Sequence, residues 1–295
     1  MRGPHNGRMP EMPEVDSLRV FLTDKLVGRT ITRIDVVAFS ALKTYDPPPS
    51  ALYGLEISGV ARHGKFLDID AQGLHLVFHL ARAGWLRWKE QQPTVPPKAG
   101  RGPLAVRVHL DDGTGFDLTE AGTQRKLAVY VVDDPGLIPH VATLGPDPLA
   151  DGFDKAALSA LLHKAGRAQL KGVLKDQRVI AGIGNAYSDE ILHAARMSPF
   201  KPASSLTDQE LTTLYDAIQS ELRGAIQRAE GLAAKDLKGE KKSGLRVHGR
   251  KGEKCPVCGD TIAEVSFSDS SLQYCPTCQT GGKKLADRRM SRLLK

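Results

Sequence analysis

The stretches CPVC at residues 255–258 and CPTC at residues 275–278 contain all four cysteines of this 295-residue chain. Each is a C-x2-C pair that directs two thiolates from one tight turn, and sixteen residues separate the pairs. This spacing predicts a zinc ribbon with strands over 262–267 and 271–274. Since four sulfurs fill a tetrahedral site, we expect one structural Zn²⁺, held by Cys255, Cys258, Cys275 and Cys278. A disulfide or redox role is the weaker alternative in a cytoplasmic chain.

Positive charge is concentrated on both sides of these cysteines. The net charge is +7, with eight Lys/Arg against three acids in 235–254 and six against one in 283–295. Such runs favour a polyanionic partner, although a charge run can also be plain solvated surface. No apolar stretch reaches the ~18 residues that a membrane span needs, and the polar residues 1–8 are no secretory signal. We therefore expect a cytoplasmic protein with no membrane association.

Hydrophobic periodicity divides the rest of the chain into a β-rich and a helical part. A helix is predicted over 14–26, followed by short alternating strands, and the Pro/Gly-rich stretch 91–103 should be a loop. Two prolines and a glycine in 144–149 then indicate a hinge. The expected strands are 65–70, 74–80, 104–110 and 126–132.

Beyond the hinge the pattern becomes helical. Helices are predicted over 155–164, 169–174 and 186–195, and a longer one begins at the capping box formed by Thr207 and Glu210. The polar, basic residues 231–254 should be a flexible connection to the cysteine module.

The segment MPEMPEV, residues 9–15, resembles the N-terminal signature of the formamidopyrimidine-DNA glycosylase and endonuclease VIII family, in which the methionine is removed and proline becomes the first residue. If the methionine is removed, Pro10 has a secondary amine that can be largely neutral near pH 7. Such an amine can attack C1′ of a deoxyribose, and the resulting iminium favours strand cleavage by elimination. Glu11 can move protons at the sugar ring oxygen, with Glu14 one helical turn away. The structural alternative is that proline and glutamate are simply favourable first-turn residues.

Further stretches resemble the family in the expected order, and together they cover nearly the whole chain from Met9 to Cys278. They are ARHGKFL at 61–67, HLARAG at 79–84, KDQRVIAGIGNAY at 175–187 and GRKG at 249–252.

The resemblance implies roles for particular residues. Lys65 would touch the phosphate next to the lesion, although a solvent-facing strand lysine is the alternative. His79 would bond a phosphate or be a satisfied core histidine. Asn185, beside glycines that let the backbone approach DNA, would donate to a phosphate. The remaining expected DNA contacts are Arg125, Lys171 and Lys251.

The implied fold is an α+β multidomain protein that holds double-stranded damaged DNA in a basic cleft, and we expect a monomer. It has an N-terminal helix with a two-layer antiparallel β sandwich, a helical helix–two-turn–helix domain and a C-terminal zinc ribbon. The expected segments are an N-terminal extension 1–8, a catalytic domain 9–143, a hinge 144–150, a DNA-binding domain 151–245, a zinc finger 246–281 and a basic tail 282–295.

Four departures from the family pattern bear mainly on the substrate. Residues 1–8 precede Met9, and their retention would leave Pro10 without an amine, so we expect the active form to begin at Pro10. Arg82 stands where purine-lesion members have a void-filling methionine. Arg125 and Leu127 replace an Arg-Arg-Phe wedge only approximately. Ser270 replaces a phosphate-clasping arginine, and the candidates to compensate for it are Arg288, Arg289 or the tail as a whole.

The sequence therefore predicts a bifunctional DNA glycosylase and AP lyase for oxidised bases, acting through Pro10 with β- or β,δ-elimination. Two alternatives stay open. The missing methionine suggests an endonuclease VIII-like preference for oxidised pyrimidines or abasic sites. The N-terminal extension suggests a non-catalytic DNA-lesion binder.

Overall fold

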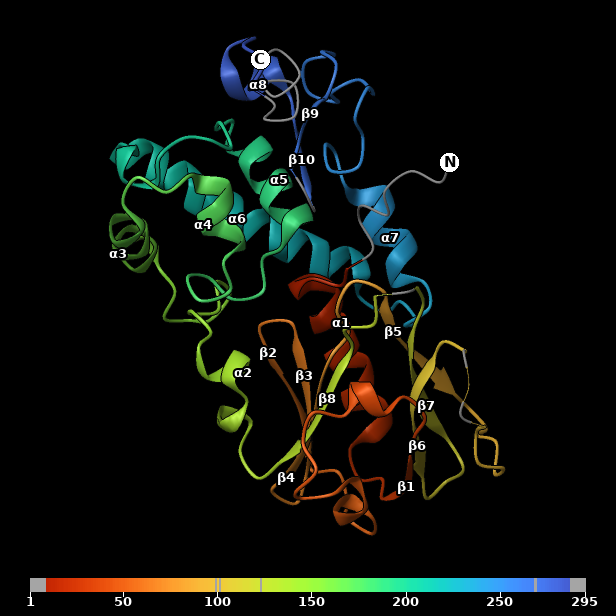
Figure 1. The fold of residues 1–295 in the computed structure, drawn as a ribbon. Helices are drawn as coiled ribbons and strands as arrows, with labels where there is room; N and C mark the ends of the chain where they lie inside the picture. Colours follow the sequence, from red (N-terminus) through yellow and green to blue (C-terminus); the bar gives the residue numbers. More distant parts are fainter. Residues whose placement is uncertain (1–8, 99, 101, 123, 268–269, 287–295) are drawn as a thin grey trace, which may run out of the picture. The chain divides into compact units, whose positions relative to one another are not determined.

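The computed structural model describes residues 9–98, 100, 102–122, 124–267 and 270–286, which form two compact units (Figure 1). The β unit consists of Arg8–Thr143 and Ala229–Lys238, and the helical–zinc unit contains Leu144–Arg228 and Gly239–Lys295. The N-terminal extension 1–8 lies outside the described residues, as do Arg288 and Arg289 with the end of the basic tail.

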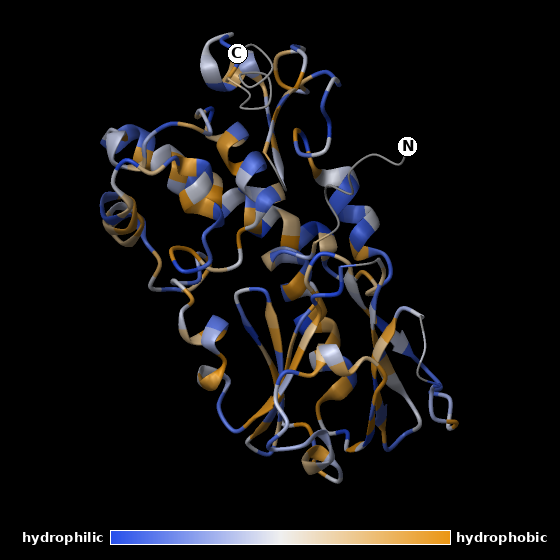
Figure 2. Ribbon diagram, in the orientation of Figure 1, coloured by the Kyte–Doolittle hydropathy of each residue, from blue (hydrophilic) through white to orange (hydrophobic). Residues whose placement is uncertain are grey.

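Two antiparallel four-stranded sheets build the β unit, which confirms the predicted sandwich. One sheet has the order β1-β6-β7-β5 and the other β2-β3-β4-β8. Apolar side chains of both sheets, including Phe78 and Phe116, meet in one core. Figure 2 colours the ribbon by hydropathy and shows many hydrophobic residues along these strands. The strands are β1 (Ile31–Val36), β2 (Gly59–His63), β3 (Phe66–Ala71), β4 (Leu74–His79), β5 (Gly84–Lys89), β6 (Leu104–Leu110), β7 (Gly115–Glu120) and β8 (Ala128–Val132).

The sequence pattern indicated β3, β4, β6 and β8 but missed the other four strands. In β7 every residue is buried, including Asp117, so polar residues occupy buried positions of this strand. Arg107 makes this possible, because its Nε and Nη2 donate to the two Asp117 carboxylate oxygens at 2.8 and 2.9 Å. A buried carboxylate is tolerated when it is paired in this way, and the pairing hides the strand from a hydrophobic pattern.

Helix α1 (Met12–Leu26) packs on β2 and β3 with its predicted apolar face. Val15, Leu18, Leu22 and Leu26 are buried in the core of the sandwich. The helix begins with a capping box, in which Glu14 and Glu11 satisfy each other's backbone N–H groups. The β unit also contains 3₁₀ turns at Phe39–Ala41, Pro49–Leu52 and Pro135–Leu137, and the short helix α2 (Pro139–Ala142).

Helices dominate the second unit, as predicted. The Thr207–Glu210 capping box is present: Glu210 N donates to Thr207 Oγ1 at 3.3 Å and Thr207 N to Glu210 Oε2 at 2.9 Å. The elements before the zinc module are α3 (Lys155–Ala165), α4 (Leu170–Lys175), α5 (Asn185–Ala194), a 3₁₀ turn at Ala203–Ser205, α6 (Asp208–Ala229) and α7 (Leu237–Gly244).

The prediction of a flexible connection over 231–254 was wrong. This stretch contains α7, and its first part packs into the β unit, where Ala234 and Leu237 belong to the core. Its second part leads Val247 into the zinc module, where Val247 is fully buried. Isolated apolar residues among many lysines anchor the stretch, and a compositional criterion overlooks them.

The zinc ribbon has the predicted hairpin, with β9 (Ala263–Ser266) antiparallel to β10 (Ser271–Tyr274). The last described helix is α8 (Pro276–Thr280), which starts inside the second cysteine pair. Among the described residues, none of the helices has the length and apolar composition that crossing a membrane requires.

Candidate functional site

Arg62 joins the start of α1 to the turn that carries Lys65. Its Nε donates to Asp16 Oδ1 on α1 at 3.2 Å, and its Nη1 donates to the Gly64 carbonyl at 3.1 Å. Gly64 has φ 57°, the sign that the first position of a two-residue II′ hairpin turn requires. The turn between β2 and β3 is thereby held against the helix that Pro10 and Glu11 precede.

The N-terminal end of α1 is itself fixed. Glu11 is the N-cap residue, and its N–H donates to Glu14 Oε2 at 2.8 Å. Both carboxylates are buried, with exposed fractions of 2% and 3%. Glu14 therefore orients the backbone of Glu11, which assigns it a positioning role beside the two residues expected to do chemistry.

Lys65 directly precedes β3, and its positive charge acts on His79 at the end of the neighbouring strand β4. Phe66 pairs with His79 in the β3–β4 ladder, and their rings lie 4.7 Å apart. Burial, with a smaller contribution from the positive charge of Lys65, lowers the pKa of His79 to about 4. The ring is therefore neutral near pH 7. Its Nδ1 accepts a hydrogen bond from Ala81 N at 3.2 Å. The neutral ring therefore carries its proton on Nε2, which is a hydrogen-bond donor.

The loop that follows His79 presents Arg82 at its exposed tip. Ala81 has φ 52°, and Gly84 N donates to the Leu80 carbonyl at 2.9 Å. A Cβ at Gly84 would lie 2.0 Å from that carbonyl oxygen, so only glycine permits the turn. Position 82 is thus held outward, with an arginine in place of a methionine.

The wedge segment agrees only in part with its prediction. Arg125 is exposed, and its Nη2 donates to the Gly102 carbonyl at 3.0 Å. Leu127, however, is 1% exposed and belongs to the core, and its N–H donates to the Glu120 carboxylate. Leu127 therefore lies in the core in this structure, and its role as an approximate wedge substitute stays a prediction.

In the helical–zinc unit, Lys171 is a buried connector. Its ammonium donates to Asn185 O at 2.6 Å, Ser188 Oγ at 2.8 Å and Asp189 Oδ1 at 2.6 Å. Only 6% of its side chain is exposed. Three acceptors match the three protons of an ammonium, so direct DNA contact would require breaking these bonds. We interpret Lys171 as a residue that positions the start of α5.

Asp189 and Glu190 extend this connection to the zinc module, and the sequence reasoning missed both. Asp189 Oδ2 accepts from His248 Nδ1 at 2.7 Å and from Gln273 N on β10 at 3.2 Å. Glu190 accepts three consecutive backbone N–H groups, from Arg246, Val247 and His248. The sequence contained one sign of this role: Asp189 and Glu190 are adjacent acids inside the helix predicted over 186–195.

Asn185 is the first residue of α5, directly after the glycine-rich turn. Its Nδ2 donates to the Ser271 carbonyl of β10 at 2.8 Å. A side-chain amide has two N–H donors, and this bond to the zinc hairpin uses one of them. The same residue thus fixes the zinc hairpin and stands where anions bind helices.

The four cysteine sulfurs converge in the zinc module, as predicted. All lie within 4.8 Å of one another, with Cys255–Cys278 at 3.9 Å and Cys258–Cys275 at 3.3 Å. Zn–S bonds of about 2.3 Å imply sulfur–sulfur edges of ~3.8 Å in a tetrahedron. This geometry is that of a four-cysteine site that suits one structural zinc ion.

The surroundings of the cluster favour a cation at its centre. Burial raises the pKa of the Cys275 thiol to about 11, and burial and the neighbouring thiols raise that of Cys278 as well. A bound divalent cation offsets that penalty and holds thiolates. His193 on α5 places Nε2 3.3 Å from Cys255 Sγ, the arrangement of an outer donor to a metal-bound sulfur.

Two expected DNA-contact positions lie on the surface of this module. Lys251 is 65% exposed, and its Nζ lies 3.1 Å from Glu264 Oε1 on β9. Such an exposed pair contributes little to stability and opens readily. Ser270 accepts from Phe267 N through its carbonyl at 2.7 Å. Its short side chain offers no cation, so the hairpin supplies no arginine at this position.

The fold and the four-cysteine site define a zinc-ribbon protein that is built on a β sandwich. Three family models match the chain in order: the formamidopyrimidine-DNA glycosylase N-terminal domain over 9–127, the formamidopyrimidine-DNA glycosylase H2TH domain over 144–236 and the zinc finger found in FPG and IleRS over 252–281. The chain belongs to the formamidopyrimidine-DNA glycosylase family.

Individual relatives agree with this assignment. Formamidopyrimidine-DNA glycosylase from Symbiobacterium thermophilum is 35% identical, over 95% of this chain and 93% of its own. An uncharacterised formamidopyrimidine-DNA glycosylase-like protein from Mycobacterium tuberculosis is 60% identical, over 53% of this chain and 98% of its own.

Solved structures show the same fold. The MutM (Fpg) protein from Thermus thermophilus has a TM-score of 0.78 at 30% identity, covering 93% of this chain and 100% of its own. The Lactococcus lactis enzyme bound to DNA with an AP site has a TM-score of 0.79 at 26% identity, covering 92% and 99%.

Proposed function

We propose that the protein is a DNA base-excision repair enzyme, a bifunctional glycosylase and AP lyase that removes oxidised bases from double-stranded DNA. Membership of a glycosylase family supports the first activity. The observation that carries the second is the joint at Arg62, which holds the Lys65 turn against the helix that follows Pro10 and Glu11. This contact supports the proposal that Pro10 as nucleophile, Glu11 as acid–base group and Lys65 as phosphate-binding cation act together in one corner of the β unit.

In the proposed reaction, the nucleotide must first leave the base stack, because C1′ is not reachable inside a duplex. The Pro10 nitrogen then bonds to C1′ while the bond from C1′ to the base breaks, and the base leaves with a proton. Glu11 delivers a proton to the sugar ring oxygen as the ring opens to the iminium. Lys65 and the His79 Nε2–H are donors for the flanking phosphates.

Elimination follows from the electron demand of the iminium. Loss of a 2′ proton expels the 3′ phosphate, and a second elimination can expel the 5′ phosphate. Water then hydrolyses the iminium and returns the free amine of Pro10. The mechanism needs a form that begins at Pro10, because a proline nitrogen inside the chain is an amide and has no nucleophilic lone pair.

Borohydride reduction tests this proposal, because it converts the iminium into a stable bond between protein and DNA. The form beginning at Pro10 should be trapped on abasic DNA, whereas the 295-residue chain should not. Glu11→Gln should lose base excision far more than binding. Equal trapping of both forms would show that another amine is the nucleophile, and Lys65 would be the first residue to test. Lesion binding without trapping of either form would favour the non-catalytic binder.

A second candidate is an endonuclease VIII-like enzyme that prefers oxidised pyrimidines or abasic sites. Arg82 favours it, because the tight turn at Gly84 presents an arginine where a methionine would fill the space of an extruded purine. Cleavage of duplexes with single defined lesions separates the two substrates. The monomeric state and the cytoplasmic location stay predictions that gel filtration and cell fractionation can test.

A further inference from the structure

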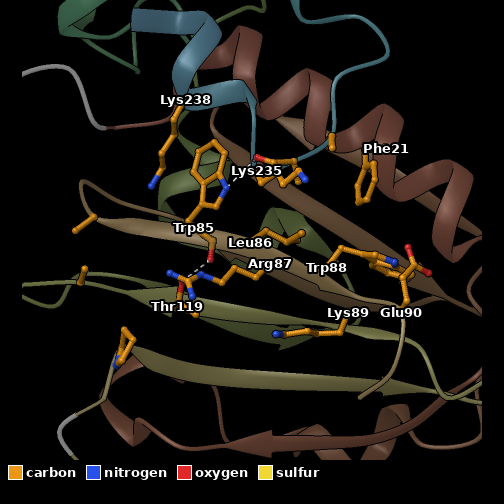
Figure 3. Close-up of a pocket in the computed structure, with 15 residues that line it drawn as sticks. Phe21, Trp85, Leu86, Arg87, Trp88, Lys89, Glu90, Thr119, Lys235 and Lys238 are labelled. Atoms are coloured by element: carbon orange, nitrogen blue, oxygen red, sulfur yellow. Dashed lines mark hydrogen bonds between the residues drawn. The ribbon is translucent and has the colours of Figure 1, made fainter. Parts of the chain in front are cut away.

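The β unit has a pocket of about 690 Å³ between α1, β5 and the segment 233–238 (Figure 3). None of the candidate catalytic residues lines it. Its volume is that of sites which bury a small ligand or a few side chains of a partner. The mechanism above therefore leaves this pocket without a role.

Aromatic rings form the floor of the pocket. Phe21 packs edge-on against Trp88 at 5.9 Å between ring centroids. Trp85 is fixed on two sides, because its Nε1 donates to the Ala234 carbonyl at 3.0 Å and Lys238 Nζ lies 4.4 Å from its ring centroid. The floor is thus apolar and rigid, which suits an apolar side chain.

The rim is strongly basic. Arg87 and Lys89 are exposed on β5, two residues apart, and therefore project to the same side of the strand. Lys235 and Lys238 are exposed on the facing segment. Glu90 is the one carboxylate among the lining residues, against these four cations. The rim therefore selects for an acidic ligand.

Two features point to an extended peptide. β5 ends its sheet in the order β1-β6-β7-β5, so the outer side of its backbone can pair with an added strand. In addition, Trp88 Nε1 is buried and has no hydrogen-bond partner among the described residues. A buried donor without an acceptor is costly, and a carbonyl or carboxylate of a ligand would satisfy it.

We propose that this pocket binds an acidic, extended peptide segment of a partner protein, with an apolar side chain on the aromatic floor and carboxylates on the basic rim. Single-stranded nucleic acid fits less well, because it requires open ring faces for base stacking. Trp85 is only 7% exposed, with Lys238 over its ring, and Trp88 is engaged by Phe21.

The test uses the full chain and a fluorescein-labelled ten-residue peptide in which aspartate alternates with valine around one phenylalanine. The pocket variant is Lys89→Glu with Lys235→Glu. The matched control is Lys43→Glu with Lys98→Glu, which makes the same charge change at exposed lysines of the same unit that do not line the pocket. Fluorescence anisotropy should show at least a tenfold weaker Kd for the pocket variant and less than a twofold change for the control.

Intrinsic fluorescence supplies an independent readout, because the chain has two tryptophans and both line this pocket. The peptide should change tryptophan emission with the same Kd, and a version with lysine in place of aspartate should not bind. Equal affinity of both variants, or of both peptides, would overturn the proposal. A third outcome would also overturn it: oligo-dT displaces the peptide, and only the pocket variant binds oligo-dT more weakly. The pocket would then be a nucleic-acid binding site.

Discussion

Replacing Asp189 by asparagine should destabilise the helical–zinc unit by about 3 kcal/mol. Asp189 is fully buried, and it pairs with an ammonium that is 6% exposed, at 2.6 Å. Removing one charge of a buried pair costs roughly 3–5 kcal/mol, because the other charge stays behind without compensation. The lower figure applies here, since the Asn185 carbonyl and Ser188 hydroxyl still accept from Lys171.

Urea unfolding with two probes measures this loss. Zinc release, followed with a chromophoric chelator, reports the helical–zinc unit, whereas emission from Trp85 and Trp88 reports the β unit. With a slope of about 2 kcal/mol per M, a 3 kcal/mol loss lowers the zinc-release midpoint by ~1.5 M. The tryptophan midpoint should not move, provided that the units unfold separately.

Two further variants make the result interpretable. Asp176→Asn removes a pair with the largely exposed Arg178 in the same unit, and should cost at most about 1 kcal/mol. Adding Lys171→Met to Asp189→Asn removes the stranded ammonium and should restore part of the stability. If Asp189→Asn behaves like Asp176→Asn, or if the second substitution lowers stability further, the network is not held by the buried charge pair.

Three other outcomes are expected. Cys275→Ser, or chelation of the metal, should remove most DNA affinity while the tryptophan-detected unfolding of the β unit is preserved; absence of stoichiometric zinc in the purified protein would contradict this. Asn185→Ala should weaken binding of damaged and undamaged duplexes by a similar factor in titrations, since phosphate contacts carry no base information, and a loss confined to damaged DNA would show that the residue reads the lesion. The pKa of His79 is lowered from 6.5 to about 4, so its contribution to stability is complete above pH 6.5 and is lost as the pH falls toward 4; the stability difference between wild type and His79→Gln should shrink over that range, and a constant difference would refute the shift.

The sequence predicted those features of the protein that depend on residues close together in the chain. The cysteine spacing predicted the zinc centre because both pairs lie in tight turns whose geometry depends on a few adjacent residues. Helix α1 and the long helix α6 followed from apolar spacing and capping residues. The glycine-rich run before Asn185 and the Pro10–Glu11 pair before α1 are also short-range motifs, and the roles that the sequence predicts for them stay predictions.

The tertiary structure decided what depends on distant partners. Lys171 was predicted to contact DNA. In the structure it is part of a buried network, because Asp189 accepts hydrogen bonds from both Lys171 and His248. Leu127 looked like a wedge, but the sandwich core takes its side chain. The pocket at Trp85 exists because Ala234, 149 residues away, folds back onto β5. Burial and charge pairing arise from long-range packing, which periodicity and spacing along the chain do not encode.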